Sequence, residues 1–102
     1  MFNWMNNNGR GYITPSTPAA YWFNLYSDSA SKFRGIATAA DVDVLLSNHT
    51  EFDGSKRKMP ALASRRPGER HPYVVGVESV ARYLTLVGEC AAAGSVKFSA
   101  AR

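Results

Sequence analysis

The chain has 102 residues, of which 45% are apolar and 20% charged, with a net charge of +4 and one cysteine, Cys90. Such a chain forms at most one small domain with a modest core, and its apolar content excludes a disordered protein. One cysteine excludes a disulfide framework, and the lack of a signal-peptide pattern or of an apolar run of ~20 residues predicts a soluble protein in a reducing compartment, outside any membrane.

Residues 1–16 are predicted to form a loop or a short extended segment. This stretch carries three consecutive asparagines, two glycines and Pro15, which are residue types that favour turns. We expect an extended piece only around Tyr12 and Ile13.

The first predicted helix begins at Thr17-Pro18, where a capping hydroxyl precedes a proline at the first helical position. Apolar or small residues then recur in steps of three and four as far as Ala40. This spacing keeps one face of a helix buried for about six turns. The predicted buried stripe consists of Trp22, Leu25, Tyr26, Ser29, Phe33, Ile36, Ala37 and Ala40.

A buried strand is predicted at 42–47, because this run is rich in valine and leucine. A polar turn with His49 follows it, and ligands often collect at the carboxyl edge of such strands. A second helix is expected from Ser55 to about Arg65, capped by Asp53 or by Ser55 itself. Its inward residues are predicted to be Met59, Leu62 and Ala63.

The C-terminal third predicts an extended segment at 71–76 and then a helix from about Val77 to Ala93. The buried stripe of this helix is predicted to be Val77, Val80, Ala81, Leu84, Val87, Gly88 and Ala91. Gly94 is expected to end the helix, and 95–102 to form a flexible tail.

These elements predict an α/β fold with three helices around one or two short strands. A lone strand leaves its backbone donors and acceptors unpaired, and two strands are marginally stable in water. We therefore expect the missing strands to come from another part of a larger protein or from a second copy of the chain.

Three stretches carry a resemblance to a known family: 26–34, 43–54 and 66–76, with 82–84 and 89–91 continuing it. Together they are similar to the C-terminal part of a metallo-β-lactamase-fold hydrolase of the subclass B3-like branch, across about residues 17–94. The resemblance implies an incomplete αββα half of that fold. It also implies hydrolysis of an amide, ester or lactone by a zinc-bound hydroxide, in a family whose members are often exported, so the compartment of this chain stays open.

In that family the histidine that ends the late strand is a zinc ligand, and His49 stands at the matching position. The other ligands belong to a His-x-His-x-Asp-His motif and a further histidine, whereas this chain has only His49 and His71. Because a hydrolytic zinc needs about three protein ligands, we expect no catalysis by this chain alone. The site would be completed by a missing N-terminal half.

The remaining chemistry-bearing residues favour structural roles. His71 is expected to pin its loop by a hydrogen bond, and Cys90 to be a buried or half-buried thiol. The basic segment 56–70 could contact phosphates, but its charges point around a helix without an aromatic platform, which favours a solvated face.

Two principal hypotheses follow from these observations. One is a fragment of a zinc hydrolase with His49 as a metal ligand. The other is a non-catalytic module derived from that fold and stabilised by self-association. Nucleic-acid binding through 56–70 is a weaker alternative.

Overall fold

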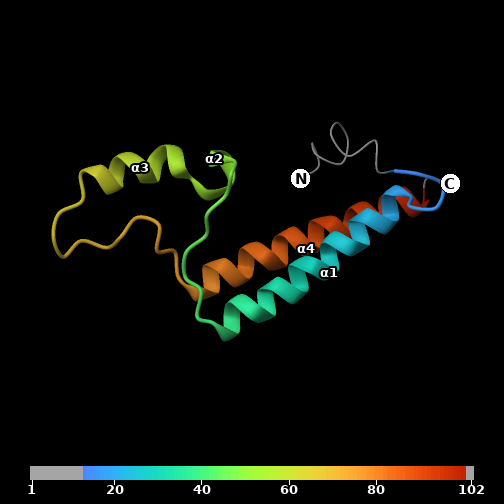
Figure 1. The fold of residues 1–102 in the computed structure, drawn as a ribbon, viewed down its shortest axis with the longest axis horizontal. Coiled ribbons are helices and arrows are strands. Elements are labelled where there is room, and N and C mark those ends of the chain that lie inside the picture. The colour runs from blue at the N-terminus through green and yellow to red at the C-terminus, as the bar shows by residue number, and fades with distance from the viewer. Residues whose placement is uncertain (1–12, 101–102) are drawn as a thin grey trace. The chain divides into compact units, whose positions relative to one another are not determined.

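The computed structural model describes residues 13–100, which form helices joined by loops (Figure 1). The helices are α1 (Ala19–Ala39), α2 (Thr50–Asp53), α3 (Ser55–Ala63) and α4 (Val77–Ala100). They hold 66% of the described residues, whereas 2% lie in a β-bridge and none in a sheet. The predicted α/β fold, an incomplete αββα metallo-β-lactamase-like half, is therefore wrong.

The chain divides into two compact units. The first combines residues 13–33 with 84–100, and the second consists of residues 34–83. The first unit contains most of the two long helices, and the second contains α2, α3 and the loops around them.

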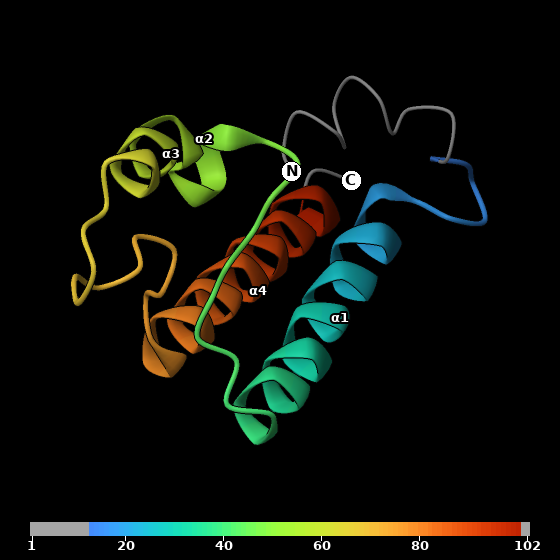
Figure 2. The same cartoon turned by 60° about the vertical axis from the view of Figure 1, so that its left-hand side comes forward.

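The first unit is an antiparallel pair of helices built around one aromatic ring (Figure 2). Phe23 of α1 is 1% exposed and clusters with Ala91 of α4, which is fully buried. The Phe23 ring also stacks on Phe98, with the ring centroids 5.4 Å apart. Next to it lies Gly94, where an added Cβ would come within 2.6 Å of the ring. Gly94 therefore leaves the space that Phe23 fills.

Further along the pair of helices, the small residues Ser27 and Ala30 of α1 and Gly88 of α4 keep the two backbones close. The Ser27 hydroxyl donates to the Gly88 carbonyl oxygen at 3.1 Å. A Cβ built at Gly88 would lie 3.5 Å from the Ala30 Cβ, which is an ordinary van der Waals distance. Because early α1 residues meet late α4 residues, the helices run in opposite directions.

The buried face of α1 is not the face that the sequence predicted. The buried side chains are those of Phe23, Ala30 and Ala37, which recur every seven residues. Of the predicted stripe only Ala37 is buried, whereas Leu25, Tyr26, Phe33 and Ile36 are all exposed by more than a third. At 100° per residue the centre of the predicted stripe lies about 80° around the helix from the centre of the buried face. The prediction was wrong because α4 packs on the narrower face of small residues.

The helix α4 confirms its predicted stripe, since Val80, Leu84 and Ala91 are buried. The predicted end at Gly94 is wrong, because α4 continues to Ala100 and residues 95–100 are helical. Gly94 lies inside the helix, where its lack of a side chain allows close packing against Phe23.

In the second unit the predicted strand at 42–47 is reduced to one antiparallel bridge between Val44 and Val74. The Asp43 carbonyl oxygen accepts the N–H groups of Val75 at 2.9 Å and Gly76 at 3.0 Å. Gly76 has φ 97°, which suits glycine and turns the chain into α4 before pairing can extend. The bridge partner of Val44 thus lies in this chain, whereas strands supplied by another part of a larger protein or by a second copy stay a prediction.

The helix predicted from Ser55 is confirmed as α3, which ends at Ala63, two residues before the predicted end. A one-turn helix, α2, precedes it and was not predicted. Met59 and Leu62 are exposed, so their predicted inward orientation is wrong. Part of the predicted N-terminal segment, residues 1–12, lies outside the described residues.

The glycines of α4 provide a matched pair of substitutions. Gly94→Ala forces a methyl group into the Phe23 ring, and such overpacking costs about 1–3 kcal/mol, only partly offset by the better helix propensity of alanine. Gly88→Ala has room and is expected to raise stability by about 0.5–1 kcal/mol. Urea unfolding followed by circular dichroism measures both. Equal effects at the two positions would contradict the packing around Phe23.

Candidate functional site

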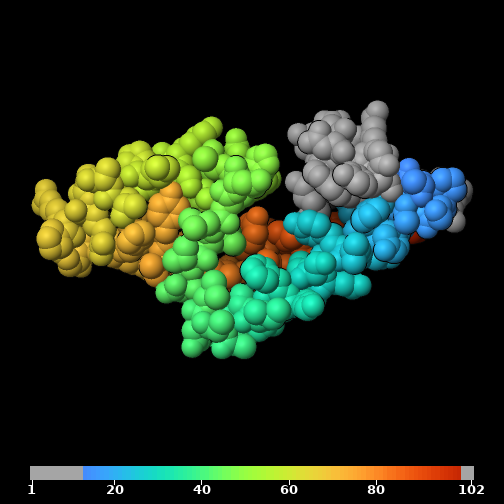
Figure 3. All heavy atoms as spheres, in the orientation of Figure 1, coloured from blue at the N-terminus to red at the C-terminus, as the bar shows by residue number. Residues whose placement is uncertain are grey.

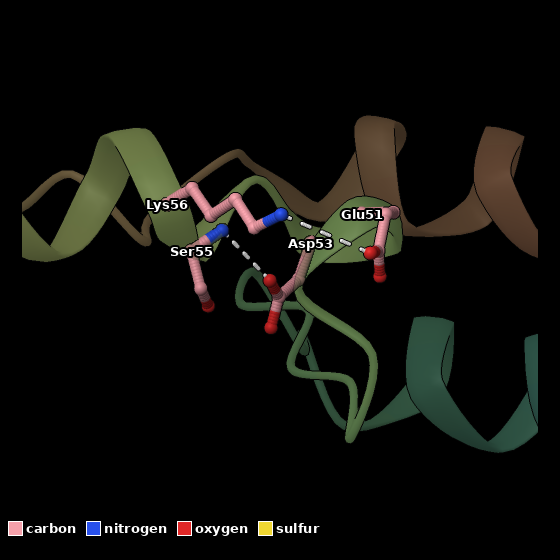
Figure 4. A network of polar contacts seen from close by, with 4 residues as sticks. All are labelled: Glu51, Asp53, Ser55 and Lys56. Atoms are coloured by element: carbon pink, nitrogen blue, oxygen red, sulfur yellow. Dashed lines mark hydrogen bonds and ion pairs between the residues drawn. The ribbon is translucent and has the colours of Figure 1, made fainter.

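The most ordered polar cluster of the second unit surrounds Asp53, between α2 and α3 (Figure 4). Asp53 is 4% exposed, and its two carboxylate oxygens have different partners. Its Oδ2 accepts the Ser47 N–H at 2.9 Å, and its Oδ1 accepts the Ser55 N–H at 2.8 Å. Gly54 between the two helices has φ 71°, which lets the chain turn back so that both donors reach one side chain.

The cluster continues to Tyr73, whose hydroxyl donates to the Ser55 Oγ at 2.9 Å. The Ser55 hydroxyl and then the Ser47 N–H hold the pKa of Asp53 below its usual value, because both stabilise the carboxylate. The ammonium group of Lys58 adds a small effect in the same direction and lies 5.5 Å from the centroid of the Tyr73 ring. The N-cap of α3 is Gly54 and not Asp53 or Ser55 as predicted, although the Asp53 carboxylate does accept the N–H of Ser55, the first residue of α3.

His49 lies at the surface, at the N-cap position of α2. Its backbone N–H donates to the Ser47 Oγ at 3.1 Å, and its ring meets the Phe52 ring edge-on at 5.8 Å. Within residues 13–100, no three histidine, cysteine or acidic side chains come together as a metal would require. The role of His49 as a zinc ligand, with the other ligands supplied from elsewhere, stays a prediction.

His71 and Cys90 take the structural roles expected of them. The His71 Nδ1 accepts the Tyr73 N–H at 3.3 Å, which confirms the hydrogen bond that pins this loop. Tyr73, held by this hydrogen bond, contacts Ser55 of the Asp53 cluster. The sequence did not predict that contact. Cys90 is a half-buried free thiol on α4, as predicted.

Basic side chains of the segment 56–70 contact residues close to them in the sequence. Lys56 lies 3.9 Å from the Glu51 carboxylate, at a distance where an exposed pair contributes little. The Arg65 Nε donates to the Glu69 carbonyl oxygen at 2.9 Å. These contacts join α3 to α2 and lie within the loop after α3, and nucleic-acid binding by this segment stays a prediction.

A second candidate surface lies on α1, on the side that α4 leaves uncovered. We define the outer stripe as Leu25, Ser29, Phe33 and Ile36, which lie within about one quadrant of the helix. Leu25, Phe33 and Ile36 are 45%, 56% and 55% exposed. Figure 3 shows side chains of α1, in cyan, at the surface. The sequence analysis placed these residues on one helix face, but it predicted that the face is buried within the chain, whereas it is exposed.

In comparisons with known proteins, no family model matches this chain, and no match was found among curated proteins or solved structures. The resemblance to metallo-β-lactamase-fold hydrolases stays a prediction for function. Among the helices of residues 13–100, none combines the length and the apolar character needed to cross a membrane.

The lowered pKa of Asp53 has a consequence for stability at acid pH. The unfolded carboxyl titrates near its ordinary value of about 3.9, and the folded one titrates below it. The stabilisation is therefore complete above about pH 4 and is lost as the pH falls through the folded pKa. Thermal unfolding between pH 7 and pH 2.5 should show a steeper acid loss for wild type than for Asp53→Asn, which has a lower melting temperature at pH 7. Parallel curves would contradict this role.

The zinc prediction can be tested directly on the purified chain. Because one imidazole without further ligands binds zinc weakly, we expect calorimetry to show no tight stoichiometric binding and no difference between wild type and His49→Ala. Tight 1:1 binding that is lost in His49→Ala would reinstate the metal site implied by the resemblance.

Proposed function

We propose that this chain is a self-associating helical-hairpin module that dimerises through the outer stripe of α1. The observation that carries this function is the exposure of Leu25, Phe33 and Ile36 on one face of a helix whose other face is covered by α4. Scattered apolar side chains are common on protein surfaces, but a stripe that follows one helix face is typical of a helix–helix contact.

The size of the stripe supports a weak association. At roughly 200 Å² per large apolar side chain, exposures near one half leave on the order of 300 Å² of apolar surface per copy. Two copies bury about 600 Å² from these side chains, and the polar flanks of a helix about 30 Å long bring the total to the low end of specific interfaces, near 1,200 Å². Interfaces of this size belong to transient complexes, which favours a micromolar dissociation constant.

The small core of the first unit supports the same proposal. Phe23 is its largest fully buried side chain, and its other buried hydrophobic residues are Ala30, Leu84 and Ala91. A core that consists mainly of alanines and one phenylalanine contributes little hydrophobic stabilisation. Association that covers the outer stripe would add to stability by mass action.

The hydrolase-fragment and nucleic-acid hypotheses depend on His49 and on the segment 56–70. The contacts around these residues favour neither hypothesis, because His49 caps a one-turn helix and the basic side chains make local contacts. The outer stripe places three exposed large apolar side chains on one face of a long helix, which the fold of the described residues does not cover.

A substitution pair on the two long helices tests the function. Phe33→Glu puts a charge into the proposed interface, and Leu86→Glu puts the same charge at a 59% exposed site on α4. We expect wild type to dimerise with a dissociation constant of about 10–100 μM. Phe33→Glu should weaken dimerisation at least tenfold and Leu86→Glu should leave it within about twofold, because only the first buries a charge.

Light scattering over 5–500 μM, with circular dichroism to confirm folding, measures these constants. A wild-type chain that is folded and monomeric at 500 μM would refute the proposed function. Equal weakening by Phe33→Glu and Leu86→Glu would show that the outer stripe is not the contact.

A further inference from the structure

We propose that the helix seated on the outer stripe is α1 of a second copy, running antiparallel with Ser29 at the two-fold axis. This inference rests on the proposed self-association and adds its geometry. A two-fold contact uses the same patch on both copies, so the patch must match itself after a half-turn. Leu25 with Phe33, and Asp28 with Lys32, meet this condition on α1.

Two of the three apolar residues of the outer stripe, Leu25 and Phe33, are arranged symmetrically about Ser29. Leu25 lies four residues before it and Phe33 four residues after it, so each is about 6 Å along the helix axis from Ser29. In an antiparallel pair centred on Ser29, each Leu25 meets Phe33 of the other copy. The small serine lies at the crossing, where it lets the two backbones approach. Its hydroxyl is satisfied within its own helix, because it donates to the Leu25 carbonyl oxygen at 2.8 Å.

The charges beside the stripe select the direction of the second helix. Asp28 and Lys32 lie on the same edge of the stripe, and their midpoint is within one residue of Ser29. In an antiparallel pair each Asp28 faces Lys32 of the other copy, which gives two opposite-charge contacts. In a parallel pair these edges lie on opposite sides of the seam, so the two opposite-charge contacts do not form. Charges that flank an apolar seam set helix orientation in this way.

The arrangement leaves the α1–α4 contact intact. Phe23, Ala30 and Ala37 face α4 or are otherwise buried, about 100° around the helix from the outer stripe. Both contacts can therefore form on one α1 at the same time. Because the contact is isologous, it closes at two copies and does not propagate.

Disulfide trapping in the full chain tests the register. In a Cys90→Ala background, Ser29→Cys places two thiols at the proposed axis. Ile36→Cys places them about 20 Å apart along an antiparallel pair but adjacent in a parallel one. Ser31→Cys, an exposed site off the stripe, is the matched control. Each variant is oxidised at 100 μM and analysed on non-reducing gels, and light scattering of the reduced protein reports the dimer independently.

We expect a reducible dimer for Ser29→Cys, formed at least tenfold faster than for Ser31→Cys or Ile36→Cys. Rapid trapping of Ile36→Cys, or trapping of Ser29→Cys no faster than Ser31→Cys while the reduced protein is still dimeric, would overturn the antiparallel register and leave self-association standing. A reduced protein that is monomeric at 500 μM would overturn both proposals.

Charge reversal gives a second, independent test. Asp28→Lys replaces two attractive contacts by two repulsive ones and should weaken dimerisation roughly tenfold at low salt. The double variant Asp28→Lys with Lys32→Asp restores the opposite pairs and should recover the wild-type constant to within about threefold. A double variant as weak as Asp28→Lys alone would contradict the pairing of these residues across the axis.

Discussion

The contact between the Phe23 ring and Gly94 is the constraint on which the first unit depends. Phe23 is the largest fully buried side chain of the described residues, and it is accommodated because residue 94 has no side chain. Once the ring occupies that space, α4 must lie along the face of α1 that also carries Ala30. The same contact determines which apolar residues of α1 are covered and which stay exposed.

The second unit is organised by a polar interaction. The Asp53 carboxylate gathers backbone donors from Ser47 and Ser55, and Tyr73 extends the cluster through the Ser55 hydroxyl. Ser47, Ser55 and Tyr73 thus hold α2, α3 and the loop before α4 together without a sheet. The polar groups of this cluster satisfy each other's hydrogen bonds, which burial requires.

The proposed function follows from the apolar face of α1 that these two contacts leave exposed. Helix α1 has two apolar faces, one formed by small residues and Phe23, and the other formed by Leu25, Phe33 and Ile36. The first holds a neighbouring helix of the same chain, and the second has the dimensions of a weak interface with another helix. The symmetry of that second face about Ser29 makes a second copy the natural occupant.

The sequence by itself determined that there are three helices and about where each begins, near residues 19, 55 and 77, since periodicity is a local property. It also determined the buried stripe of α4, but not the end of that helix. Only the tertiary structure decided that α4 packs on Phe23 and Ala30, that Gly94 is a packing position, and that Val44 makes one bridge with Val74 in place of a strand. The physical reason is that periodicity records how apolar a face is, whereas its partner depends on the fit of small and large side chains between segments distant in sequence. On α1, helix α4 therefore packs on the face with Phe23 and Ala30, which fits it better, and leaves the more apolar face exposed.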